Sequence, residues 1–257
     1  MKRVHLFEFE DQPWFPKVIR DGITNYLRFV ANRLDFYQSV APIIIDGLSR
    51  SGGSTIVDLA SGGGGGWSKL TDHLVGHVPT LRVILTDRFP NADAMAALVK
   101  ENSSVFSFDK NPVDARRVPP RLVGLRTQFL SLHHFNPEDA RQILRNAVDA
   151  GQPIAVFEAQ KRDLRHLIQF SMSPIAVLLM TPLIRPLRMS QLVFTYLVPV
   201  IPLVTLWDGL VSVLRTYTAE ELDSIIKSIP NGDSYTWEIG ESSSGPVTIF
   251  YMLGCPK

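Results

Sequence analysis

Residues 55–67, TIVDLASGGGGGW, decide the fold expected of this chain. A short β-branched run, typical of a buried strand, is followed by five consecutive glycines and a tryptophan. Each glycine loses more conformational entropy on folding than any other residue, so such a run indicates backbone that must approach something closely. A glycine-rich turn between a strand and a helix also exposes N–H groups to a ligand. The stretch therefore predicts a ligand-binding strand–turn–helix unit.

The same alternation of strands and helices continues on both sides of this unit. Further buried strands are expected at 81–86, 105–108, 122–130 and 154–157, with helices from Trp67, at 93–100 and at 137–150. Such alternation is typical of parallel βαβ units with right-handed crossovers. Two more strands, 235–239 and 247–253, predict a C-terminal antiparallel hairpin that closes the sheet.

The ends of this core are also readable. Apolar residues at spacings of three and four predict helices between about residues 16 and 50, interrupted at Pro42. Thr218 and Glu221 form a capping box that begins a helix before the hairpin. We expect one domain over 1–257, with a helical lid (1–50), a cofactor-binding core (55–163), an apolar insertion (164–214) and a C-terminal helix and hairpin (215–257).

Composition narrows the function classes. The 26 Lys and Arg nearly balance 25 Asp and Glu, so the chain lacks the basic excess of most nucleic-acid binders, and we expect no nucleic-acid partner. The single Cys255 excludes an internal disulfide and any zinc site built on several cysteines. The N-terminal residues have no apolar stretch of a secretory signal. These features predict a cytoplasmic protein.

Two acidic residues near the glycine run indicate that its ligand is a nucleotide cofactor. Asp58 lies inside the strand before the run, and Asp87 ends the next strand, where a carboxylate can accept both hydroxyls of a ribose. Dinucleotides and S-adenosylmethionine (SAM) both fit such a unit. An acid three residues before the loop suits a cofactor with a cationic amino-acid end better than a pyrophosphate.

On these residues the sequence resembles the class I SAM-dependent methyltransferases of the bacterial small-molecule type. Their first motif, apolar-apolar-Asp-apolar-Gly-x-Gly-x-Gly, matches at Asp58, Gly62 and Gly64, with Ala60 in place of the first glycine. The resemblance covers 55–160 and 216–254. It implies a Rossmann-like α/β fold with a seven-stranded mixed sheet, in which the last strand is reversed, and SAM as cofactor with S-adenosylhomocysteine as product.

The resemblance also implies a set of site residues. Cofactor-binding positions are Asp58, Ala60, Ser61, Gly62, Gly64, Asp87, Arg88, Asp114 and Ala115, with Tyr26 and Tyr37 from the N-terminal helix. Residues 129–135, FLSLHHF, occupy the segment that faces the transferring methyl in this family. Candidate acceptor contacts are Trp14, Phe135, Glu158 and Trp207. Glu158 could equally form a structural ion pair with Lys161 or Arg162.

His133 and His134 are the candidate general bases, because they follow a strand at the edge where open α/β sheets bind ligands. Since they are adjacent, we expect them to point in different directions, so that one at most is the base. No metal-ligand cluster is recognisable, which argues against metal-assisted catechol chemistry, and we expect no metal. The acceptor atom, oxygen, nitrogen or carbon, stays open.

The apolar insertion is the second unusual feature. Its longer tract, 192–207, has 16 residues with Pro199 and Pro202 inside, too short and broken for an ordinary spanning helix. We interpret 164–214 as one or two broken helices that form an acceptor lid or the interface of a homo-oligomer, with contact to a membrane surface as the alternative. Aromatic and methionine side chains there are candidates to line an apolar acceptor site: Phe170, Met172, Met180, Phe194, Tyr196 and Trp207.

The sequence thus predicts methyl transfer from SAM to a small hydrophobic, aromatic acceptor, by C-methylation of an indole carbon or by O-methylation. Three alternatives remain. A membrane-associated lipid or quinone methyltransferase keeps the cofactor, an NAD(P)-dependent oxidoreductase uses the glycine turn for a pyrophosphate, and a non-catalytic module only binds SAM.

Overall fold

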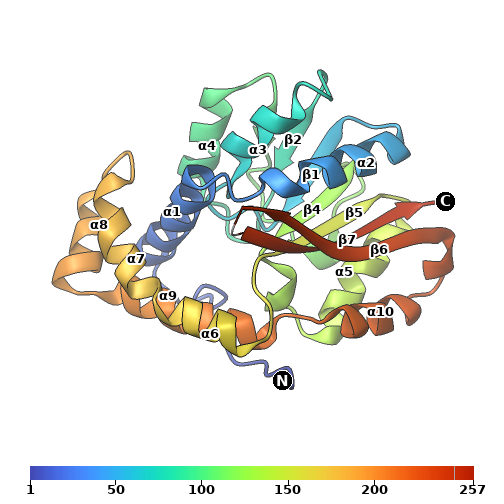
Figure 1. Ribbon diagram of the computed structural model, residues 1–257. Helices are drawn as coiled ribbons and strands as arrows, with labels where there is room; N and C mark the ends of the chain where they lie inside the picture. Colours follow the sequence, from blue (N-terminus) through green and yellow to red (C-terminus); the bar gives the residue numbers. More distant parts are fainter. Residues whose placement is uncertain (246) are drawn as a thin grey trace.

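A mixed seven-stranded sheet forms the centre of the protein (Figure 1). The computed structural model describes residues 1–245 and 247–257. The strands are β1 (Thr55–Leu59), β2 (Arg82–Leu85), β3 (Phe106–Phe108), β4 (Leu125–Phe129), β5 (Ile154–Glu158), β6 (Tyr235–Ser244) and β7 (Val247–Pro256). They lie in the order β3-β2-β1-β4-β5-β7-β6, and β7 alone runs antiparallel to both neighbours. The predicted fold class, with its reversed last strand, is confirmed.

Ten α-helices surround the sheet in the described residues. They are α1 (Lys17–Arg33), α2 (Ala41–Ser51), α3 (Trp67–Leu74), α4 (Ala92–Glu101), α5 (Pro137–Asp149), α6 (Leu164–Ser171), α7 (Ser173–Met180), α8 (Met189–Leu192), α9 (Val200–Arg215) and α10 (Ala219–Lys227). Helices α2, α3 and α4 pack on one face of the sheet and α5 and α10 on the other, each over its own apolar cluster.

Local signals predicted several elements closely. Strand β1 has the predicted bounds, and the capping box of Thr218 and Glu221 begins α10. Strand β4 is shorter than predicted, because Gly124 and Leu130 at its two ends have φ values of +144° and +48°, which extended strands do not adopt. The hairpin strands instead extend past the predicted ends, to Ser244 and Pro256.

The apolar insertion is helical and interrupted, as predicted. It forms the separate helices α6 to α9, of which α7 and α9 pack on α1 through a cluster that includes Ile23, Val177 and Ile201. These segments agree with the predicted one or two broken helices, since Leu164–Leu183 counts as one helix and Met189–Leu197 with Val200–Arg215 forms a pair bent by 76°. Prolines at the starts of α7 and the following turn, and a π-helical stretch over Val193–Leu197, break the chain more often than hydropathy alone indicates.

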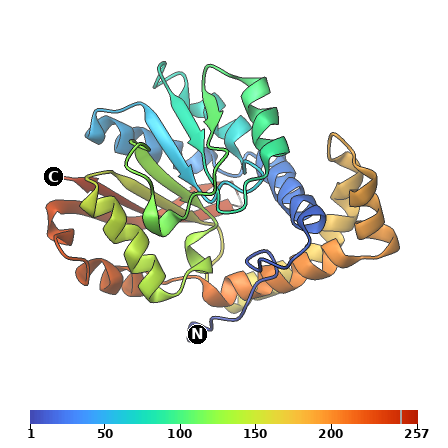
Figure 2. The ribbon, with the colours of Figure 1, turned by 180° about the vertical axis from the view of Figure 1, so that it is seen from behind.

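The N-terminal residues before α1 are not helical, so the predicted lid is helical only from Lys17. They run along α9, as Figure 2 shows from behind. The Val4 N–H donates to the Leu214 carbonyl oxygen at 3.1 Å, and the Trp207 indole donates to the Phe7 carbonyl oxygen at 3.0 Å. The first residues of the chain and the insertion therefore form one layer beside the sheet.

Candidate active site

The five glycines connect β1 to α3 in a loop that leaves no room for a side chain at Gly64 and Gly66. Gly64 has a φ of +87°, and a Cβ atom there would overlap the side chain of Leu98 on α4. A Cβ atom at Gly66 would come within 2.5 Å of the Tyr37 ring. Because neighbouring elements press on the loop from two sides, glycine is needed there for close packing as well as for backbone conformation.

Helix α1 covers this glycine loop through residues that the sequence did not single out. Asn32 donates a hydrogen bond to the Gly65 carbonyl oxygen at 2.8 Å and accepts one from the Lys69 N–H at 2.9 Å. Thr24 lies directly over the loop. Tyr26 instead packs in the cluster that α1 shares with α7 and α9. Thr24 and Asn32 are eight residues apart, about two helical turns, and so lie on the same face of α1. This spacing of polar residues is the sequence signal that could have predicted which face of α1 contacts the glycines.

Ala60 opens the glycine loop in a strained conformation. Its φ is +59°, in the left-handed region that costs an L-residue with a Cβ roughly 1–2 kcal/mol. The residue stands where the methyltransferase motif has its first glycine.

We expect Ala60→Gly to stabilise the protein by about 0.5–1 kcal/mol, because glycine adopts this φ without strain. The gain is smaller than the full strain energy, since glycine also raises the conformational entropy of the unfolded chain. Urea denaturation would measure the change. Ala97→Gly, on the exposed side of α4, is the control and is expected to lose about 1 kcal/mol. A destabilised Ala60→Gly would show that the Ala60 methyl group packs favourably despite its backbone.

Asp58 is enclosed by the protein. One carboxylate oxygen accepts from the Trp67 indole and the other from the Thr127 hydroxyl, both at 2.8 Å. Burial raises the pKa of Asp58 to about 6. Ser61 donates to the Asp58 carbonyl oxygen and accepts from the Thr86 N–H, which joins the loop to β1 and β2. Asp58 and Ser61 thus hold the loop in shape, and direct cofactor contact by either stays a prediction.

Asp87 is the acid that reaches the glycine loop. Its carboxylate accepts from the Gly62 N–H at 2.7 Å and from the Phe89 N–H at 2.6 Å, and burial raises its pKa. Its carbonyl oxygen accepts from the Val113 N–H at 2.9 Å. The loops after β1, β2 and β3 therefore meet at Asp87. The neighbouring Arg88 is exposed, with its guanidinium 5.5 Å from the Phe89 ring centre.

Asp114 and Ala115 follow β3 in the same region. Asp114 begins a short 3-10 turn, accepts from the Arg116 N–H at 3.0 Å and forms an ion pair with the Arg116 side chain at 2.6 Å. This hydrogen bond from the Arg116 side chain lowers the pKa of Asp114. Ala115 is buried beneath it against the sheet. Their predicted place near the adenine is untested.

Unpartnered polar groups gather where β4 ends. Both side-chain amide atoms of Gln128, the Ser131 hydroxyl and Nε2 of His133 are buried without a hydrogen-bond partner among the described residues. Leu130, between them, has a left-handed φ of +48°. Burying a polar atom without a hydrogen-bond partner costs free energy. Several such atoms at the carboxyl end of a central strand therefore indicate a binding site, where a polar ligand would supply the missing hydrogen bonds.

Glu158 holds His133 in a buried dyad. Nδ1 of His133 lies 2.8 Å from the Glu158 carboxylate, which also accepts the His133 N–H at 3.1 Å, and Gln160 donates to the same carboxylate at 3.1 Å. An ionised carboxylate only accepts, so we assign the proton to Nδ1 and a lone pair to Nε2. The alternative of an ion pair from Glu158 to Lys161 or Arg162 is wrong, since these pair with Glu241 and Glu221.

The two histidine rings do not point in different directions. Their centres lie 4.3 Å apart with planes tilted by 33°. They belong to a 3-10 turn, Leu132–His134, where successive residues are separated by about 120° instead of the 180° of a strand. His134 binds Asp11 at 2.8 Å and Glu8 at 3.0 Å. Burial alone would lower the pKa of His134, but these two carboxylates raise it to about 10. This pKa makes His134 a cation and leaves His133 as the base candidate.

The same arrangement corrects the expectation that no metal-ligand cluster exists. Donor atoms of Glu8, His133 and His134 lie within 4.8 Å of one another. Arg215 is buried beside them, 3.3 Å from Glu8 and 2.9 Å from Asp11, and donates to the carbonyl oxygens of both histidines. This cation balances the carboxylates, so the group is already a neutralised ion-pair network. The sequence missed Glu8, Asp11 and Arg215 because they lie more than 80 residues from the histidines in the chain.

Two of the predicted acceptor residues, Trp14 and Trp207, lie in the layer that the N-terminal residues form with the insertion. Trp14 is two-thirds exposed and contacts Phe9, and Trp207 contacts Phe7 with its ring. Phe135 packs on the sheet, and its carbonyl oxygen accepts from Tyr217. Tyr37 contacts the Phe129 ring at 4.7 Å, beside the glycine loop. Phe135 follows His133 by two residues in the chain. The Tyr37 ring lies against Gly66 of the glycine loop.

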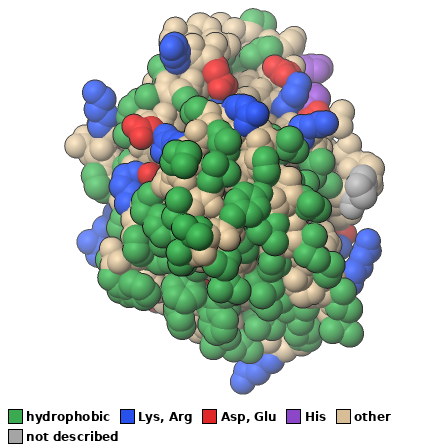
Figure 3. Space-filling model, turned by 90° about the vertical axis from the view of Figure 1, so that its left-hand side faces the viewer, with side chains coloured by type: hydrophobic (Ala, Val, Ile, Leu, Met, Phe, Trp, Pro, Cys, Tyr) green, Lys and Arg blue, Asp and Glu red, His purple; other side chains and the backbone are tan. Residues whose placement is uncertain are grey.

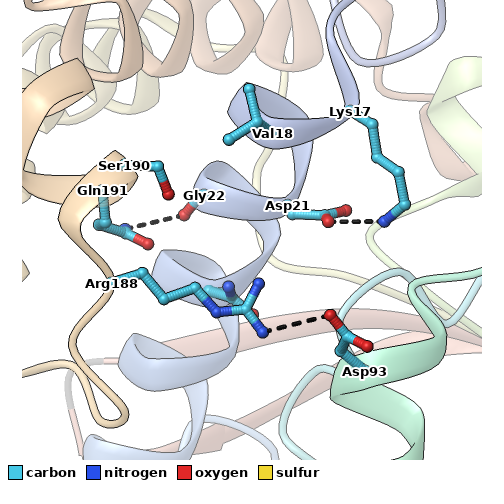
Figure 4. A pocket seen from close by; sticks show the side chains of 9 residues that line it. Lys17, Val18, Asp21, Gly22, Asp93, Arg188, Ser190 and Gln191 are labelled. Atoms are coloured by element: carbon cyan, nitrogen blue, oxygen red, sulfur yellow. Dashed lines mark hydrogen bonds and ion pairs between the residues drawn. The ribbon is translucent and has the colours of Figure 1, made fainter.

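A surface cavity of about 360 Å³ lies apart from these residues (Figure 4). It lies between α1, α4 and α8, where the Gln191 side chain donates to the Gly22 carbonyl oxygen at 3.0 Å and Arg188 pairs with Asp93 at 3.5 Å. None of the predicted site residues lines it. Its contacts attach the insertion to the core of the protein.

Comparison with known proteins identifies the fold. No family model matches the chain, and no curated protein matches its sequence. An O-methyltransferase family 2 protein of Planctomyces limnophilus, solved with apigenin, matches with a TM-score of 0.55 at 14% identity over 96% of this chain and 63% of that chain. An O-methyltransferase family protein of Burkholderia thailandensis matches with a TM-score of 0.50 at 15% identity over 90% and 58%. This chain thus spans about three fifths of the length of these proteins.

A third similar structure carries a different description. A protein of Rhodobacter sphaeroides described as a Zn-dependent alcohol dehydrogenase matches with a TM-score of 0.51 at 12% identity, over 92% of this chain and 98% of that chain. At such identities each likeness shows the fold alone. The strand order separates the two descriptions, because dinucleotide-binding sheets have the parallel order 3-2-1-4-5-6, whereas here a reversed strand lies between β5 and β6.

Proposed function

We propose that this chain, which has the class I methyltransferase fold, transfers a methyl group from SAM to a small apolar acceptor. The observation that carries the proposal is the meeting of the glycine loop with Asp87 at the carboxyl ends of β1 and β2. A carboxylate at this place can accept the hydroxyls of a ribose, and the loop leaves no side chain in its way.

The residues present fit this cofactor. Asp87 and Gly62 would hold the ribose, and Asp114 and Ala115 would contact the adenine. The unpartnered Gln128 and Ser131 offer further polar atoms where β4 ends. When bound, SAM supplies an electrophilic methyl group on a sulfonium. Arg88, Tyr26 and Tyr37 stay predicted cofactor contacts. Arg88 is exposed, and Tyr26 packs against the insertion and not against the glycine loop.

His133 accounts for the acceptor side of the reaction. Its Nε2 lone pair can take a proton from an acceptor hydroxyl, while Glu158 stabilises the resulting imidazolium through Nδ1. A buried base is useful only where the acceptor loses a proton, which favours a phenol oxygen or an aromatic carbon. The apigenin complex of the Planctomyces protein supports an aromatic acceptor. A cytoplasmic location stays a prediction.

Calorimetric titration with SAM and S-adenosylhomocysteine tests the cofactor. We expect micromolar dissociation constants and a 10- to 100-fold weaker affinity for Asp87→Ala, because a charged hydrogen bond contributes about 1.5–3 kcal/mol. Asp72→Ala, an exposed acid on α3, is the control and should bind as the native chain does. Circular dichroism checks the fold of each variant. Binding of NAD or NADP in place of SAM, or of none of these, would refute the proposal.

A further inference from the structure

Helices α6 and α7 share a continuous apolar stripe that faces away from the protein. Its residues follow one another at spacings of three and four and are each at least half exposed: Leu164, Ile168, Met172, Ile175, Leu179 and Leu183. Met189, Leu197 and Leu203 extend it, with exposed fractions of 74%, 77% and 61%. We call these nine residues the outer apolar face. Met172, predicted to line the acceptor site, belongs to it.

This face is much larger than the scattered apolar residues of an ordinary surface. Residues 164–207 hold fourteen of the twenty-five large apolar side chains that are exposed in the described residues. Figure 3 shows them gathered over one side of the molecule, with Lys and Arg side chains at the edges. Contiguous exposed apolar patches of this kind mark an interaction site.

The charges around the face select its partner. Residues 164–207 contain Arg165, Arg185 and Arg188 but no Asp or Glu. In a two-fold symmetric dimer the same patch faces itself, so these cations would meet one another without an acid from the segment. An apolar face whose own segment carries basic but no acidic side chains is instead complementary to a layer that is apolar inside and negatively charged at its surface.

We propose that the outer apolar face docks on the surface of an anionic lipid bilayer. The segment Leu164–Leu183 is long and apolar enough to cross a membrane, and Met189–Leu197 with Val200–Arg215 passes the same test but bends by 76°. Docking in the plane of the surface agrees better with the structure. Arg165 and Gln169 lie within the first segment, and Val177 of its second half is fully buried against α1 and α9.

Vesicle flotation with the full chain tests this proposal. We expect binding to vesicles of phosphatidylcholine with phosphatidylglycerol, and weaker binding to phosphatidylcholine alone. Leu179→Glu and Leu203→Glu should each lower the partition coefficient at least tenfold, since a buried apolar contact is lost and a like charge approaches the lipid. Arg185→Glu should lower it for the anionic vesicles only. Val123→Glu is the matched control, because Val123 is 58% exposed outside the insertion.

The readout is lipid binding, so it does not depend on the proposed methyl transfer. Sedimentation velocity without lipid completes the experiment. A native chain that fails to float, or that floats equally after Leu179→Glu, overturns the proposal. A lipid-free dimer that Leu179→Glu converts to monomers overturns it as well, in favour of an interface between two copies.

Discussion

Replacing His133 by alanine is expected to lower kcat for methyl transfer by about 10²- to 10⁴-fold, the usual contribution of a positioned general base. The affinity for SAM should stay within about twofold of the native value, because the ribose contacts assigned to Asp87 and Gly62 do not involve the ring. A panel of phenols and indoles, followed by mass spectrometry of the products, supplies the assay.

The expectation follows from the isolation of His133. Its ring is 2% exposed, and Nε2 is unpartnered, with the nearest carboxylate oxygen, on Glu8, 3.9 Å away. Because Glu158 holds Nδ1, rotation of the ring is prevented and Nε2 keeps its direction. A group that is buried, oriented and unpartnered has the properties of a base prepared for one acceptor.

Two further variants separate catalysis from positioning. Glu158→Gln keeps a hydrogen-bond acceptor for Nδ1 but loses the charge that stabilises the imidazolium, so we expect a smaller loss of kcat than for His133→Ala. His134→Asn should change activity less than His133→Ala. Equal losses for both histidines, or a full loss of SAM binding with His133→Ala, would contradict the assignment.

Arg215→Ala is expected to destabilise the protein by about 3–5 kcal/mol, the cost of breaking a buried ion pair by removing one partner. Arg215 is 2% exposed and pairs with Glu8 and Asp11. Its removal leaves two carboxylates opposite the single cation of His134. It also frees the carbonyl oxygens of His133 and His134, to which Arg215 donates.

Urea denaturation measures this effect. Arg145→Ala is the control, since Arg145 and Asp149 form an exposed ion pair on α5 and such pairs contribute about 0–0.5 kcal/mol. Arg215→Met keeps the apolar part of the side chain and separates loss of packing from loss of charge. A loss below about 1 kcal/mol for Arg215→Ala would show that the network is hydrated and that its members are not mutually dependent.

The sequence by itself determined the elements whose signals are local. Strand β1, the glycine loop and α3 depend on residues that are neighbours in the chain, and the capping box of α10 closes within four residues. The antiparallel pairing of β6 and β7 follows from a short turn between two apolar runs, because such a turn brings the second run back beside the first.

Only the tertiary structure decided the contents of the candidate site. Glu158 meets His133 because β4 and β5 are paired in register, and Glu8 and Arg215 meet the histidines across more than 80 residues of sequence. The outward face of α6 and α7 likewise depends on which side of each helix packs on α9. Hydropathy shows that α7 is apolar nearly all round, whereas α6 also carries Arg165, His166 and Gln169. It is the contacts with α1 and α9 that leave one side of α7 exposed.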